Sequence, residues 1–128
     1  MIPKKPMPRL EATMFDQIPL RDMERGLAKP IATVGMEPNE ISKKSGLQFE
    51  SAEDDLDRLE AALIHSKSGR QYALVRHEHQ PGPGTDILTN EHSPRLTDDL
   101  LEVLQLLRIQ LEDLTWIHPD IGVDRIRR

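Results

Sequence analysis

The stretch from residue 71 to residue 89 constrains the fold most. Residues 71–79 (QYALVRHEH) and residues 85–89 (TDILT) both have strand-like composition, and the segment QPGPG separates them. Two such runs joined by proline and glycine are typical of a β-hairpin. The loop is too long for a two-residue hairpin turn and suits a wider connection. The sequence therefore predicts two antiparallel strands.

A helix is expected before this hairpin. Ser51 is a suitable N-cap, and the acidic residues 53–55 would complement the positive end of the helix dipole. Apolar residues then recur at helical spacing, at Ala52, Leu56, Leu59 and Leu63. The expected helix would end at Ser68 and Gly69. Residues 47–50 alternate apolar and polar and predict a short strand ahead of the helix.

A second helix is expected after the hairpin, starting at Pro94 or Thr97. Its leucines follow in a heptad-like pattern, at Leu100, Leu104, Leu107, Leu111 and Leu114. Leu101, Val103, Leu106 and Ile109 widen the apolar surface. A helix this apolar must be covered on more than one side.

Residues 1–45 differ from the rest of the chain. Six of the ten prolines and all five methionines lie there. Proline removes a backbone donor and disfavours helix at the preceding residue, so a long helix is excluded. The only helical candidate is short, around residues 20–27. We expect residues 1–45 to form a Pro-rich arm that is flexible or laid extended on a partner.

The expected fold is a small α+β unit over residues 46–119, in the order (β)-α-β-β-α. A two- or three-stranded antiparallel sheet would be packed by two helices, with Leu74, Val75, Leu104 and Leu107 in the core. Residues 120–128 would form a basic C-terminal tail. A unit of this size buries only about 60% of its unfolded surface, so it is marginal by itself.

Composition excludes several classes of function. The chain has no cysteine, which removes disulfides and thiolate chemistry. Its net charge of −5 disfavours nucleic acids and anionic membranes as partners. No signal peptide or membrane-spanning apolar run is recognisable, so a cytoplasmic protein is expected. No sequence motif calls for a cofactor.

Two groups of residues could bind a metal. His77 and His79 form an HxH pair that would place two imidazoles on one strand face. Glu78 would point to the other face and be a poor third ligand, so Asp86 or Glu91 would be needed. Asp54 and Asp57 would lie one turn apart on the expected helix and could share a cation. A solvated strand end and a solvated helix N-terminus are the simpler interpretations.

The sequence favours a non-enzymatic protein–protein interaction module, such as an adaptor, chaperone, antitoxin or immunity-type protein. The partner would be a second copy or another protein, bound through the helix of residues 100–114. Leu101, Leu106, Ile109 and Trp116 would form the interaction surface. The alternative is a metal-binding regulator or metal-dependent enzyme that uses His77 and His79.

Overall fold

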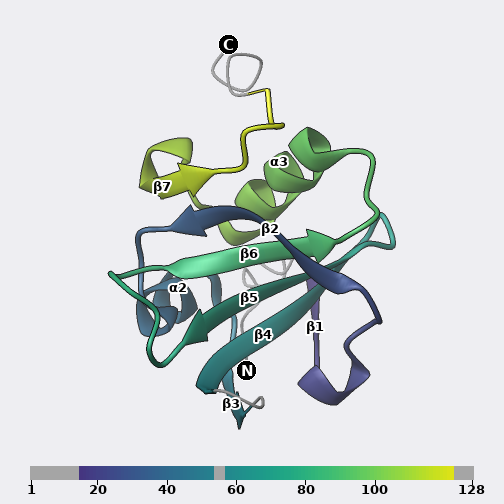
Figure 1. The fold of residues 1–128 in the computed structure, drawn as a ribbon. Helices are drawn as coiled ribbons and strands as arrows, with labels where there is room; N and C mark the ends of the chain where they lie inside the picture. Colours follow the sequence, from purple (N-terminus) through teal and green to yellow (C-terminus); the bar gives the residue numbers. More distant parts are fainter. Residues whose placement is uncertain (1–14, 54–56, 123–128) are drawn as a thin grey trace, which may run out of the picture.

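One antiparallel sheet organises the chain in the computed structural model, which describes residues 15–53 and 57–122 (Figure 1). The strands are β1 (Phe15–Ile18), β2 (Leu27–Val34), β3 (Glu50–Glu53), β4 (Arg58–Ser66), β5 (Gln71–His77), β6 (Thr85–Asn90) and β7 (Leu114–Ile117). The helices are α2 (Pro38–Ser45) and α3 (Leu96–Leu107), with 3-10 turns η1 (Leu20–Asp22) and η2 (Leu111–Asp113). Neither α2 nor α3 is long and apolar enough to cross a lipid bilayer, and no other helix of the described chain is.

The strand order is β1-β4-β5-β6-β2-β7, with β3 also paired to β4. β1 and β3 share the same edge of β4, because Ile18 pairs with Leu63 and Glu50 pairs with Ala61. β2 comes early in the chain and yet lies between β6 and β7. The sheet therefore needs segments from both ends of the described chain.

The predicted hairpin is confirmed. β5 and β6 pair antiparallel, with Leu74 opposite Ile87 and Val75 opposite Asp86. The loop between them is anchored by Arg76, whose Nη1 donates to the carbonyl oxygens of Gly82 and Gly84 at 3.1 and 2.7 Å. Part of the predicted core is confirmed as well: Leu74, Leu104 and Leu107 are buried between the sheet and the helices, whereas Val75 is buried on the opposite face of the sheet.

The helix predicted from Ser51 onward is wrong, because this segment forms β3 and β4. Residues 61–64 of β4 are buried on both faces of the sheet. The sequence of a strand that is covered on both faces is a continuous apolar run. Periodicity cannot distinguish such a run from a buried helix. Of the apolar residues in the predicted helical pattern, Ala52 lies in β3 and Leu59 and Leu63 lie in β4, while Leu56 is outside the described residues.

The predicted fold class is also wrong. A seven-stranded sheet replaces the expected two or three strands, and α2 and α3 are the two α-helices of the described residues. β1, β2 and α2 all come from the segment expected to be a flexible arm. Two of its described prolines occupy tolerated positions: Pro38 starts α2, and Pro30 is exposed beside a register shift of β2.

The core has two parts, one on each face of the sheet. The larger part lies between the sheet and the helices and contains Ile31, Tyr72, Leu74 and Leu100. The smaller part lies on the opposite face and consists of Leu27, Ala61, Leu63, Ala73 and Val75.

The wide apolar surface of α3 is covered by the chain itself. Leu100, Val103, Leu104, Leu106 and Leu107 are buried. The segment that follows α3 returns to the same cluster, where Ile109 and Ile121 are buried and Leu114 and Ile117 pack against it. The second side of the helix therefore needs no partner, apart from the exposed Leu101.

A substitution at Gly84 would test how closely the β5–β6 loop approaches β2. The φ of Gly84 is +123°, and a Cβ there would lie 2.8 Å from the carbonyl oxygen of Val34. We expect Gly84→Ala to lower the free energy of unfolding by roughly 1–3 kcal/mol, through backbone strain and overpacking. Gly82→Ala is the matched control, since that glycine also has positive φ but open space around it. If urea unfolding showed the same loss of unfolding free energy in both variants, the close approach of the loop to β2 would be unimportant.

Candidate functional site

The outer edge of β7 is the first candidate site. β7 pairs with β2, with Thr33 opposite Trp116, and no strand lies on its other side in the described chain (Figure 1). Hydrogen bonds close both ends of this pairing: Gly35 N donates to Asp113 O at 2.8 Å, and His118 N donates to Ile31 O at 2.9 Å. The opposite row of β7 backbone groups faces away from the sheet.

β7 also lacks the charges that usually protect a sheet edge. Its sequence is LTWI, whereas the outer strand β1 carries Asp16 and the outer strand β3 carries Glu50 and Glu53. Charged residues on an edge strand discourage pairing with another chain. Among the outer strands of the described sheet, β7 is thus the uncharged one.

Trp116 makes this edge apolar as well as uncharged. The residue is 43% exposed, and its ring meets that of His118 edge-on with the centroids 6.1 Å apart. Cross-strand pairing places Trp116 in one row with Thr33, Asp86 and Val75, on the sheet face opposite the helices. Tryptophan at such a position offers a large contact area at low conformational cost.

The structure separates the four residues expected to form an interaction surface on the last helix. Leu106 and Ile109 are 8% and 4% exposed and belong to the core. Leu101 on α3 and Trp116 on β7 are exposed, at 41% and 43%. The helix surface expected to bind a partner is therefore used within the chain.

The two histidines of the HxH pair do not occupy equivalent positions. His77 is the last residue of β5 and lies opposite Leu59, while His79 follows in the turn. The alternation expected through residue 79 stops at His77, so Glu78 does not point away as expected. Asp57, Glu78 and His79 together form the group whose ligand atoms all lie within 4.8 Å of one another. Asp54, the other residue of the predicted acidic pair, lies outside the described residues.

Asp57 is the most enclosed member of this group, with a side chain 11% exposed against 79% for His79. Its Oδ2 accepts from the His79 backbone N at 3.0 Å, and its Oδ1 lies 2.8 Å from the ring Nδ1 of His79. The hydrogen bond from the His79 backbone is the main reason that the pKa of Asp57 lies below its ordinary value. The carboxyl group is therefore held in its ionised form.

A surface hollow of about 590 Å³ adjoins this group between β3, β4 and β5. It is lined by Ser51, Ala52, Glu53, Arg58, Leu59, Glu60, Arg76, His77 and Glu78. Three of its charges are already paired within the protein, since Arg58 Nε lies 3.3 Å from Glu53 Oε2 and Arg76 Nε lies 3.1 Å from Glu37 Oε1. Glu78 belongs both to the hollow and to the group of metal-ligand side chains.

A buried polar network was not recognised from the sequence. Asp99, 1% exposed at the start of α3, accepts from Thr89 Oγ1 at 2.9 Å and from Ser93 Oγ at 2.6 Å, and pairs with Arg70 Nη1 at 3.1 Å. Tyr72 OH donates to Glu102 Oε1 at 2.6 Å, and burial raises the pKa of Tyr72 above its ordinary value. The donors and acceptors satisfy one another, so the network anchors α3 to the sheet.

The chain matches no protein-family model, and it is similar to none of the curated proteins or solved structures with which it was compared. The function proposed below therefore rests on the geometry of the chain and on its chemistry.

Proposed function

We propose that this protein is a non-enzymatic interaction module that binds an extended strand along the outer edge of β7. The observation that carries the proposal is an uncharged edge strand with an exposed tryptophan. Strand addition to a sheet edge gives affinity through backbone hydrogen bonds and specificity through side chains on alternate positions. It requires no reactive group.

The direction of the backbone groups supports this binding mode. In an antiparallel ladder, successive residues direct their amide and carbonyl groups to opposite sides of the strand. His118 N donates to Ile31 O in β2, so the backbone groups of Ile117 face away from β2. An incoming strand would pair with such outward groups and contact Thr115 and Trp116, which are exposed.

A second copy of the chain is the occupant that we propose. In antiparallel self-pairing, residues whose backbone groups face outward lie opposite one another. A two-fold axis at Trp116 would therefore place Thr115 of each copy opposite Ile117 of the other. The two exposed Trp116 side chains would then lie opposite each other at the axis and bury apolar surface of both copies. Because β7 has only four residues, the association should be weak and depend on concentration.

Adding a charge to this edge tests the proposal. We expect Thr115→Lys to weaken self-association about tenfold or more, because a lysine on an edge strand opposes pairing. Trp116 is the only tryptophan of the chain, so its fluorescence reports on the edge directly. In the wild type, its emission should shift to the blue as light scattering shows dimers forming.

Gln105→Lys is the matched control, since Gln105 is exposed on α3 and the variant adds the same charge elsewhere. It should associate like the wild type. A wild type that stays monomeric at all concentrations would contradict self-pairing. Equal association of wild type and Thr115→Lys would show that a different surface is used.

A further inference from the structure

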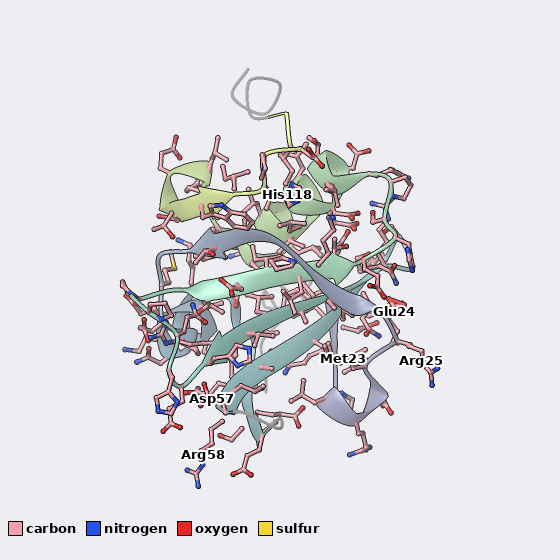
Figure 2. All side chains as sticks on the ribbon, in the orientation of Figure 1. Met23, Glu24, Arg25, Asp57, Arg58 and His118 are labelled. Atoms are coloured by element: carbon pink, nitrogen blue, oxygen red, sulfur yellow. The ribbon has the colours of Figure 1, made fainter. Side chains whose placement is uncertain are left out.

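The register of β4 and β5 brings Asp57 and His79 together. Leu59 lies opposite His77, and Glu78 N donates to Arg58 O at 2.9 Å, which extends the ladder by one residue. Asp57, immediately before β4, therefore meets the turn that follows β5. Figure 2 shows Asp57 at one end of the molecule and His118, next to β7, at the other. This location is thus separate from the edge proposed to bind a partner.

The donor set at this turn suits a transition metal. An imidazole and two carboxylates are ligands of Zn²⁺, which binds nitrogen and oxygen donors at about 2.0–2.2 Å. The Asp57 Oδ1 to His79 Nδ1 distance is 2.8 Å, and the three ligand atoms lie within 4.8 Å of one another. Small rotations of the exposed Glu78 and His79 side chains would bring the donors around one ion. The ion would replace the hydrogen now shared by Oδ1 and Nδ1.

Backbone groups around Asp57 orient its carboxylate so that it can act as the central ligand. Backbone amides of Arg58 and His79 donate to its two oxygens, at 2.8 and 3.0 Å. These bonds fix the orientation of the carboxylate. The ligand is therefore oriented before any ion arrives.

We propose that Asp57, Glu78 and His79 form a binding site for one Zn²⁺ ion. Three protein ligands leave a position of a tetrahedral ion to water or to a molecule in the adjoining hollow. The site uses only one histidine of the HxH pair, with Asp57 and Glu78 in place of His77. The proposal does not depend on self-association through β7.

Titration of the full-length chain with zinc chloride, followed by calorimetry, tests this site. We expect the wild type to bind one Zn²⁺ ion, and His79→Ala or Glu78→Gln to weaken binding roughly tenfold or more. Zn²⁺ should also raise the melting temperature of the wild type, because the ion binds the folded chain. Circular dichroism of each variant shows that the loss is not caused by unfolding.

His77→Ala is the matched control, and it should bind Zn²⁺ like the wild type. Equal losses in His77→Ala and His79→Ala would overturn the proposed ligand set in favour of the HxH pair. Undiminished binding in His79→Ala would place the ion elsewhere, for example at His65 or His92. Failure of the wild type to bind Zn²⁺ would overturn the proposal altogether.

Discussion

A chain that starts at Gly46 should not fold. It would lack β1, β2 and α2, and β6 and β7 would lose the strand that lies between them. Ile31, Ala32 and Val34 of β2 are fully buried. Removing even one large core side chain costs about 2–5 kcal/mol, whereas a domain is stable by about 5–15 kcal/mol in total. We therefore expect far-UV circular dichroism of residues 46–128 to show an unfolded chain.

A chain that starts at Phe15 is the control, because it retains every element that the structure describes. It should melt cooperatively. Cooperative melting of residues 46–128 would instead restore the independent domain expected from the sequence and would contradict the position of β2 in the sheet.

Replacing Asp99 with alanine should also lower the free energy of unfolding strongly. The variant would remove the carboxylate that pairs with Arg70 and would leave the hydroxyl groups of Thr89 and Ser93 without this acceptor. Removing one member of a buried ion pair costs about 3–5 kcal/mol, and each stranded polar group adds to the loss. Urea unfolding of Asp99→Ala should therefore show a loss of at least about 3 kcal/mol.

Asp98→Ala is the matched control for this variant. Asp98 is the preceding residue and pairs with Arg95 at 3.2 Å, but both side chains are more than half exposed. An exposed ion pair contributes less than about 1 kcal/mol. Similar losses at positions 98 and 99 would mean that the network around Asp99 does not anchor α3.

Of the candidate sites, the sequence reveals the residues but not their grouping. The sequence indicates both His79 and Asp57 as possible ligands, though in separate pairs, His79 with His77 and Asp57 with Asp54. The β4–β5 register places Asp57 beside His79, and that register depends on β4 being a strand. Trp116 was expected on a helix-based surface, and the pairing of β7 with β2 places it on a sheet edge instead.

Local sequence determined the elements whose signals are local. The proline and glycine residues between two strand-like runs specify the β5–β6 hairpin. The leucine spacing specifies α3 as far as Leu107, but the predicted helix was too long, because Leu111 lies in η2 and Leu114 in β7. Turn chemistry and helical periodicity act over a few residues, so a short window of sequence contains them.

Only the tertiary structure determined that residues 58–66 form a strand and that residues 15–45 belong to the folded domain. The apolar run of β4 becomes a strand because β1 and β3 pair with one edge and β5 with the other. β2 lies between β6 and β7, although both of these strands are far from β2 in the sequence. This is possible because sheet pairing is non-local. Such pairing depends on partners that a local pattern does not contain, and tertiary context then overrides local propensity.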